Sequence, residues 1–365
     1  MTSLLWRRAS ALRWVLGAAL LSAPAAAAQG RITNAKTETR SAAEGVAREV
    51  QAAAARGVAT WVGYRAPMVS GPRQMCCYDT IGDAGNCCGR CRLDGGSGVS
   101  MSQADSRVSL EPPTEFLVLA RVDGGAVMRL RTFTPDCDID AGGMPIVWLD
   151  DVRPDDSIAW LATLVAAAPE MGEVHDRVAK QAIGAIAMHN VASADRTLEG
   201  FVAPSRPEWV RADTAFWLGS ARGAAGARLL ARMMKDDASD KVRDKVAFGL
   251  SVSKEASALG ALIEAARTDK STRVRGQALF WLAHKAGDKA VSTITNAIAN
   301  DPETEVKKKA VFALSQLPRD EGVPRLIEVA RTNRNPEVRK QAMFWLGQSH
   351  DPRAVQFFEQ ILTSK

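Results

Sequence analysis

Five of the six cysteines in this chain fall within sixteen residues, in the stretch QMCCYDTIGDAGNCCGRC. They are Cys76, Cys77, Cys87, Cys88 and Cys91, and the sixth, Cys137, lies apart in FTPDCDIDAGG. Thiols at such short spacings can form disulfides, bind zinc as thiolates, or catalyse thiol–disulfide exchange. Which chemistry applies depends on the compartment in which the protein folds.

The first 28 residues have the pattern of a secretory signal peptide. Three arginines form a basic start, an apolar run covers residues 14–21, and a row of alanines precedes Gln29. The apolar run is shorter than the roughly 18 residues that suggest a membrane-spanning helix, and no later segment approaches that length. We therefore expect cleavage near Ala28, export to the bacterial periplasm or beyond, and no membrane span in the mature chain.

In an oxidising compartment, six cysteines indicate a disulfide framework first. Adjacent cysteines rarely bond to each other, so we expect links between the Cys76–Cys77 pair, the 87–91 group and Cys137, with the pairing left open. Zinc is the second interpretation, although no histidine lies near the cluster. Redox catalysis by the C-G-R-C tetrapeptide is the third, because its flanks have the composition of a loop.

Charge and motifs exclude several functions. The formal net charge falls from +6 to +3 without the three signal arginines, which is too small to indicate a nucleic-acid partner. The chain lacks H-E-x-x-H, G-x-S-x-G, Walker A and dinucleotide-binding glycine motifs, and its four histidines are scattered. We therefore expect neither enzymatic activity nor a cofactor.

The strongest pattern in the sequence is a 32-residue repeat in its second half. Valine followed by arginine or lysine recurs at 210, 242, 274, 306 and 338, with phenylalanine six residues later and leucine eight residues later in each copy. Because one helical pair cannot bury both of its faces, neighbouring units must stack into an array. The apolar spacing predicts two helices per unit, with Ser239, Ser271 and Asn335 as N-caps and Gly219, Gly287 and Gly347 between helices.

Two columns of the repeat predict contacts between units. The phenylalanines are expected to pack repeat on repeat, and Trp217, Trp281 and Trp345 are expected in the core. The basic column is expected to face an acidic column as a ladder, in preference to forming an anion-binding stripe. The ladder residues are Arg211, Arg243, Arg275, Lys307, Arg339, Asp237, Asp269 and Asp301.

The V-R-x-x-A-x-x-x-L helix, the D-x-x-x-x-V-R junction and the 32-residue period resemble bacterial HEAT repeats of the short, phycobilisome-lyase-like type. The resemblance covers residues 205–365 and extends back to about 170, and it implies a right-handed α-solenoid that binds macromolecules. No lyase motif matches, so lyase activity is not implied. The stretches WVGYRAPMV, CCGRC and PDCDIDAGGMPIVWL resemble the front module of uncharacterised exported HEAT-repeat proteins, which brings no known activity.

The resemblance also implies that the second helices line the concave face and bind a protein partner of the periplasm or envelope. The candidate partner-binding residues are Arg228, Arg232, Lys235, Glu264, Arg267, Asn296, Glu328, Arg331, Gln356 and Gln360. Phe357 and Phe358 are expected either to dock on the preceding helix or to form a dimer contact through the C-terminal repeat.

The first half predicts a different architecture. Residues 41–56 read as a helix, and "TEFLVLARVDGGAVMRLRTF" reads as a β-hairpin turning at Gly124 and Gly125. The fold class is therefore an α-solenoid preceded by a small α+β domain with disulfides, divided as 1–28 signal peptide, 29–150 α+β domain, 151–170 linking helix and 171–365 array of five to six repeats. The functional hypothesis is an exported scaffold; the alternative is a thiol-redox or zinc-dependent activity in the cysteine-rich module, with the solenoid as substrate dock.

Overall fold

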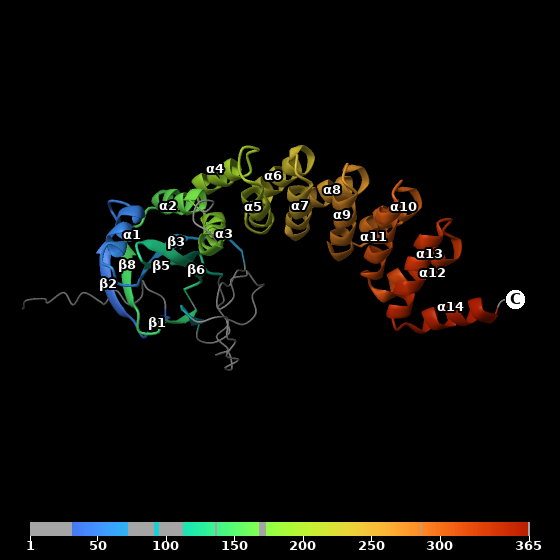
Figure 1. Ribbon diagram of the computed structural model, residues 1–365, viewed down its shortest axis with the longest axis horizontal. Helices are drawn as coiled ribbons and strands as arrows, with labels where there is room; N and C mark the ends of the chain where they lie inside the picture. Colours follow the sequence, from blue (N-terminus) through green and yellow to red (C-terminus); the bar gives the residue numbers. More distant parts are fainter. Residues whose placement is uncertain are drawn as a thin grey trace, which may run out of the picture.

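The computed structural model describes residues 31–71, 91–94, 112–135, 137–167, 173–285 and 287–363. A small sheet module stands at one end, and an arch of paired helices runs from it to the C-terminus (Figure 1). The elements of the module are β1 (Arg31–Thr33), β2 (Lys36–Ser41), α1 (Val46–Ala54), β3 (Thr60–Pro67), β4 (Cys91–Arg92), β5 (Glu115–Asp123), β6 (Ala126–Phe133), β7 (Asp138–Asp140) and β8 (Pro145–Asp150).

The main sheet has five strands in the order β2-β8-β3-β5-β6. Strands β2, β8 and β3 run parallel, whereas β5 is antiparallel to both β3 and β6. The β5–β6 turn is made by Gly124 and Gly125, whose φ angles of 57° and 84° suit a tight hairpin turn that other residues rarely adopt. The hairpin therefore lies where the sequence predicts it.

Both faces of this sheet are covered. Tyr64, Phe116 and Val118 lie on the face packed by α1, α2 (Pro154–Ala167) and α3 (Glu173–Met188). Trp61 and Trp148 lie on the opposite face, in a second core shared with the small sheet β1-β7-β4. A strand buried on both faces is apolar at consecutive positions, which explains why β5 reads as a continuous apolar run.

The module and the array share one core. Helix α2 packs on the sheet through Trp160, whose ring meets Tyr64 edge-on at 6.2 Å between centroids. The end of β3 is joined to the end of α3 by backbone hydrogen bonds, from Val69 N to Met188 O (2.9 Å) and from Asn190 N to the Pro67 carbonyl oxygen (3.0 Å). The segment expected to link the two parts is thus itself a packed layer between them.

The array is a solenoid of six helical pairs within the described residues, beginning with α3 and α4 (Figure 1). Each buried valine of the repeat stands near the start of a first helix, and Val242, Val274, Val306 and Val338 are all fully buried. The remaining helices are α4 (Ala192–Phe201), α5 (Glu208–Ala221), α6 (Gly223–Asp236), α7 (Asp240–Val252), α8 (Ala256–Thr268), α9 (Thr272–Lys285), α10 (Asp288–Asn300), α11 (Thr304–Ser315), α12 (Arg319–Thr332), α13 (Pro336–Gln348) and α14 (Pro352–Thr363).

The helix starts follow local sequence signals. The Ser239 hydroxyl accepts a hydrogen bond from Val242 N at 3.3 Å and begins α7. The Asn335 side chain accepts from Glu337 N at 3.0 Å, and Pro336 occupies the first turn of α13. Both N-caps match the sequence prediction, because Ser and Asn satisfy backbone donors that a helix start leaves open. Along the described helices, none is both long enough and apolar enough to cross a bilayer.

The first helices approach each other more closely than side chains would normally permit. Gly219 lies inside α5, and a Cβ there would stand 1.9 Å from the Gly249 carbonyl oxygen of α7. Gly347 likewise lies inside α13. The prediction that these two glycines separate helices is therefore wrong, and the physical reason for Gly219 is backbone-to-backbone packing.

Close packing on one side makes the array curve. In Figure 1 the first helices α5, α7, α9 and α11 lie along the inner side of the arch, and the second helices α4, α6, α8 and α10 lie along its outer side. Small residues between first helices bring that layer together, so the layer of second helices fans out. The expectation that second helices line the concave face is therefore wrong for this part of the array.

Replacing Gly219 by alanine is expected to destabilise the protein by about 1–3 kcal/mol, the range for overpacked sites. The added Cβ must push α5 away from α7, which outweighs the gain of about 1 kcal/mol in helix propensity. The control is Gly260→Ala in α8, where a Cβ meets nothing within 4 Å. Chemical denaturation measures both; a Gly219→Ala protein as stable as the control would contradict the close approach.

Candidate functional site on the inner face of the array

A stripe of aromatic side chains runs along the first helices on the inner side of the arch. It comprises the phenylalanine column of the repeat and three tryptophans that follow alternate members of that column. We call it the aromatic stripe, and its residues are Phe216, Trp217, Phe248, Phe280, Trp281, Phe312, Phe344 and Trp345.

The rings of the stripe contact one another from repeat to repeat. Phe216 stacks on Phe248 with centroids 5.5 Å apart, and Phe280 stacks on Phe312 at 5.6 Å. Trp281 bridges the two stacks, because its ring lies 4.7 Å from that of Phe248. Aromatic pairs at such separations add to the stability of a packed surface. The stripe is therefore continuous and held in place by its own contacts.

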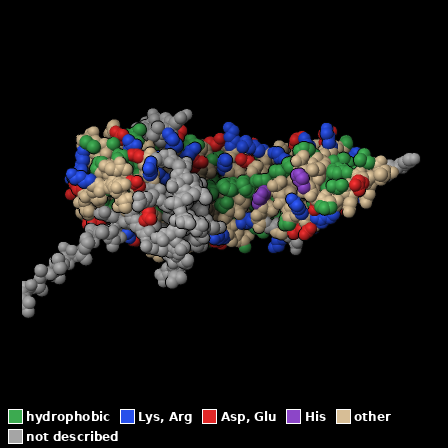
Figure 2. Space-filling view, turned by 90° about the horizontal axis from the view of Figure 1, so that it is seen from below, with side chains coloured by type: hydrophobic (Ala, Val, Ile, Leu, Met, Phe, Trp, Pro, Cys, Tyr) green, Lys and Arg blue, Asp and Glu red, His purple; other side chains and the backbone are tan. Residues whose placement is uncertain are grey.

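The stripe is only half buried. Every ring from Phe216 to Trp345 is partly accessible, and Phe344 is 54% exposed. Figure 2 views the molecule from below and shows a band of hydrophobic side chains running lengthwise on this face, with lysines and arginines at its borders. The expectation that Trp217, Trp281 and Trp345 belong wholly to the core is therefore wrong: they pack against the core with one side and form surface with the other.

Polar groups border the stripe unevenly. Lys245, Lys309 and Lys340 are exposed and form no ion pair with any described residue. Near the first stack, burial raises the pKa of Asp213, and Lys180 lies 3.7 Å from its Oδ2. This Oδ2 atom is sealed from solvent and has no hydrogen-bond donor in the described structure.

The ladder columns meet between successive turns of the solenoid. Arg211, Arg243 and Arg275 each make a two-pronged contact with the aspartate 26 residues later, with Nε to Oδ2 distances of 2.8 Å in all three pairs. The same aspartates accept a backbone N–H two residues further on, as Asp269 does from Ser271 N at 2.8 Å. These arginines are buried under the loops between repeats, so they hold the repeats together and are not presented to a ligand.

The ladder changes at the C-terminal end. Lys307 replaces the arginine, and its Nζ donates to the Ala299 carbonyl oxygen at 3.1 Å instead of reaching a carboxylate. Asn333 replaces the aspartate, and Arg339 donates to the Asn333 carbonyl oxygen at 2.8 Å. The last two repeats are thus joined without buried charge pairs of this kind.

The partner-binding residues expected from the sequence are all exposed on second helices, among them Arg228, Lys235, Arg267 and Gln356. Several engage their neighbours: Arg232 pairs with Glu199 at 2.7 Å, and Arg331 donates to Gln360 Oε1 at 2.5 Å. The helices α6, α8 and α10, which carry several of these residues, lie along the outer side of the arch (Figure 1). They therefore do not surround the aromatic stripe. Phe357 is only 2% exposed and docks within its own array.

Most of the cysteine cluster lies outside the described residues. This applies to Cys76, Cys77, Cys87 and Cys88, and the backbone of Cys91 forms part of β4. Cys137 is fully buried in the second core and is disulfide-bonded, with a partner whose side chain is not among those described. The pairing within the cluster remains a prediction.

A buried polar network, which the sequence gave no reason to expect, fixes the joint between module and array. His189 Nδ1 donates to the Ala185 carbonyl oxygen (2.7 Å), and its Nε2 accepts from the Ser157 hydroxyl (3.0 Å). The Ser157 oxygen in turn accepts from the Tyr64 hydroxyl at 2.7 Å. The serine and histidine resemble a catalytic pair, but both are fully buried, so no substrate can reach them. Burial lowers the pKa of His189 to about 4 and raises that of Tyr64.

Comparison with known proteins agrees with the repeat pattern. A family model of HEAT repeats matches residues 259–329 and 291–365, so this part of the chain consists of HEAT repeats, as the 32-residue period predicts. No curated protein matches the chain.

Three solved structures illustrate the similarity. The complex of CpcE and CpcF of phycocyanin lyase from Nostoc sp. PCC7120 is 24% identical, with 42% of this chain and 99% of that chain covered and a TM-score of 0.32. Human deoxyhypusine hydroxylase in complex with glycerol is 13% identical, with coverages of 57% and 91% and a TM-score of 0.25. A designed armadillo repeat protein in complex with the peptide (KR)4 is 16% identical, with coverages of 52% and 99% and a TM-score of 0.31.

Proposed function

We propose that this protein is an exported scaffold that holds a partner protein against the inner face of its helical array. The observation that carries the proposal is the continuous, half-exposed aromatic stripe. Monomeric proteins rarely expose contiguous apolar surface of this kind, and large aromatic side chains supply most of the binding energy where proteins meet. HEAT repeats present such extended surfaces because each repeat adds one more contact position.

Export rests on the N-terminal 28 residues, and it places the partner in the periplasm or envelope. The disulfide at Cys137 is compatible with an oxidising compartment. A thiol-redox role gains no support from Cys137, because a buried, bonded sulfur is not a nucleophile. The array is therefore the part to which we assign the function.

Site-specific photo-crosslinking in cells tests where the partner lies. A photoreactive residue at position 248 or 280, within the aromatic stripe, is expected to yield discrete adducts with one envelope protein, which mass spectrometry identifies. The same residue at positions 232 and 264, on the outer side, serves as the matched control and is expected to give none. Adducts from the outer positions alone would place the partner on the second helices instead.

Binding measurements with the purified partner then test how much the inner-face and outer-face residues contribute to affinity. The double substitution Phe248→Ser and Phe280→Ser is expected to weaken binding at least 30-fold, the equivalent of about 2 kcal/mol for losing central aromatic contacts. Arg232→Glu with Glu264→Lys is expected to leave affinity within about threefold, because exposed charges at a distance contribute little. Circular dichroism confirms that both variants remain folded; equal binding by the serine variant would overturn the inner-face assignment.

A further inference from the structure

The repeats carry a second feature, independent of the aromatic stripe: a cation that closes the end of a first helix. In the first instance, Arg222 Nη1 donates to two carbonyl oxygens at the end of α3, those of Ala187 (3.1 Å) and His189 (2.7 Å). In the second, Lys285 Nζ donates to the carbonyl oxygens of Ser251 (3.0 Å) and Ser253 at the end of α7. The two sets of acceptors are 64 residues apart, which is two repeats.

A cation at this place has a clear physical role. The last carbonyl groups of a helix have no partner within it and carry the negative end of the helix dipole. A lysine or arginine from the following repeat satisfies them. Lys285 is half-buried where it contacts these oxygens, and burial lowers the pKa of its ammonium group.

The third instance lacks its cation. The residues 64 positions after Ser251 and Ser253 are Ser315 and Leu317, at the end of α11. The residue 64 positions after Lys285 is Ser349. Ser349 is too short to reach them and instead donates to the Leu346 carbonyl oxygen at 2.6 Å. No described donor forms a hydrogen bond with the carbonyl oxygen of Ser315 or Leu317.

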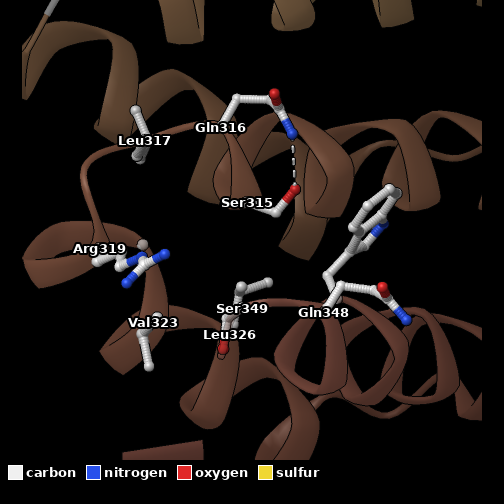
Figure 3. A pocket seen from close by; sticks show the side chains of 10 residues that line it. Ser315, Gln316, Leu317, Arg319, Val323, Leu326, Gln348 and Ser349 are labelled. Carbon is white, nitrogen blue, oxygen red and sulfur yellow. Dashed lines mark hydrogen bonds between the residues drawn. The ribbon is translucent and has the colours of Figure 1, made fainter. Parts of the chain in front are cut away.

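A cavity of about 240 Å³ opens at this same place, between α11, α12 and α13 (Figure 3). Ser315 and Leu317 both line it, together with Ser349 and Trp345. Ser315, Leu326 and Trp345 of its lining correspond to Ser251, Leu262 and Trp281 of the earlier repeat, so part of the lining recurs while the cation does not. The cavity therefore lies at the place in the repeat where Lys285 makes its contacts in the earlier copy.

Charged side chains of both signs lie near the cavity, and among the described residues that line it Arg319 is the only charged one. Its border segments, 319–322 and 349–353, carry the carboxylates of Asp320, Glu321 and Asp351 against the guanidinium groups of Arg319 and Arg353. Arg353 is already paired with Asp351 at 2.7 Å and with Asp320 at 3.2 Å. These two segments together carry a formal charge of −1, and Arg319 occupies the repeat position that corresponds to Glu255.

We propose that this cavity binds a primary alkylammonium group, such as the side chain of a lysine on a partner protein or a free alkylamine. The ammonium group would donate to the carbonyl oxygens of Ser315 and Leu317, as Lys285 donates to those of Ser251 and Ser253. The alkyl chain would lie along Trp345 and Leu326. The dissociation constant for one isolated alkylammonium group is expected to lie in the millimolar range.

Titration with n-butylammonium, followed by the indole N–H resonance of Trp345 in nuclear magnetic resonance spectra, tests the proposal on the full chain. Saturable binding at one site is expected for the native protein, with n-butanol as the neutral control. Ser349→Lys supplies the missing cation and is expected to abolish this binding. Lys285→Ala empties the earlier site and is expected to raise the number of sites to two.

Two further arms complete the test. Arg319→Glu replaces the only charged side chain in the described lining of the cavity by a carboxylate and is expected to tighten binding severalfold. Lysine blocked at both its α-amino and carboxyl groups is expected to bind as n-butylammonium does; binding of n-butylammonium alone would assign the cavity to free amines. Equal binding of n-butanol, or unchanged binding in both Ser349→Lys and Arg319→Glu, would overturn the proposal.

Discussion

Replacing Arg243 by alanine is expected to lower the free energy of unfolding by about 3–5 kcal/mol, the cost of leaving one member of a buried ion pair without its partner. The side chains of Arg243 and Asp269 are only 2% and 5% exposed. Two hydrogen bonds join them, at 2.8 and 3.0 Å, and a third runs from Arg243 Nη1 to the Asp237 carbonyl oxygen at 2.8 Å. Alanine removes all three and leaves the Asp269 carboxylate buried.

Urea denaturation of Arg243→Ala, Asp269→Ala and the double variant measures this effect and the coupling between the two residues. The double variant is expected to be less destabilised than the sum of the single variants, because removing both partners leaves no isolated charge. Arg232→Ala is the control: its pair with Glu199 is equally short, at 2.7 Å, but both side chains are more than half exposed. A cost above about 1 kcal/mol for Arg232→Ala would contradict the role given to burial.

The position of the substitution matters as well as its cost. In a solenoid each repeat contacts only its neighbours, so stability accumulates from one junction to the next. Arg243 lies in the middle of the array, and its loss weakens the junction between α7 and α9. Among the described residues, the junction after Lys307 lacks the buried arginine–aspartate pair of the earlier junctions, so the C-terminal repeats are expected to unfold first in the native protein.

The repeat array could be predicted from the sequence because every copy must satisfy the same neighbours. Stacking requires the same contact at each junction, so columns such as Phe216 and Phe248 recur at a fixed spacing and reveal both the period and the helices. The N-caps at Ser239 and Asn335 are local signals within a few residues. The β-hairpin at Gly124 and Gly125 was readable for the same reason, because its turn chemistry is local.

Other features depend on contacts that no local pattern encodes. The direction of curvature follows from how closely Gly219 meets Gly249 across two helices, and the 32-residue columns do not reveal that distance. Likewise, β8 enters the sheet between β2 and β3, which a linear reading of strands does not indicate. The cation missing at Ser349 is visible in the sequence only after the structure shows what Lys285 contacts.

The buried network between the sheet module and the array is expected to make the protein less stable in mild acid. Tyr64, Ser157 and His189 come from three elements far apart in the chain, and they meet where the sheet packs on the array. The Nε2 atom of His189 accepts a hydrogen bond from Ser157, and it can do so only while the imidazole is neutral. Burial is the main reason that the pKa of His189 falls to about 4, and the nearby Arg222 guanidinium lowers it further.

The sign of the effect follows from the protons bound in each state. The unfolded chain protonates His189 below its ordinary pKa of about 6.5, whereas the folded protein does so only near pH 4. Stability from this group is therefore complete above pH 6.5 and is lost progressively as the pH falls to 4. The loss between pH 7 and pH 5 is expected to be about 2 kcal/mol.

Urea denaturation of the native protein and of His189→Gln at pH 7, 6 and 5 isolates this contribution, because all other titrating groups are shared. The pKa values of Glu38 and Asp351, lowered to about 2 by their arginine partners, affect stability only at more acidic pH. The glutamine variant is expected to be less stable at pH 7 but to lose about 2 kcal/mol less than the native protein by pH 5. Parallel losses in both proteins would show that His189 is not the neutral, buried acceptor that holds the sheet module against the array.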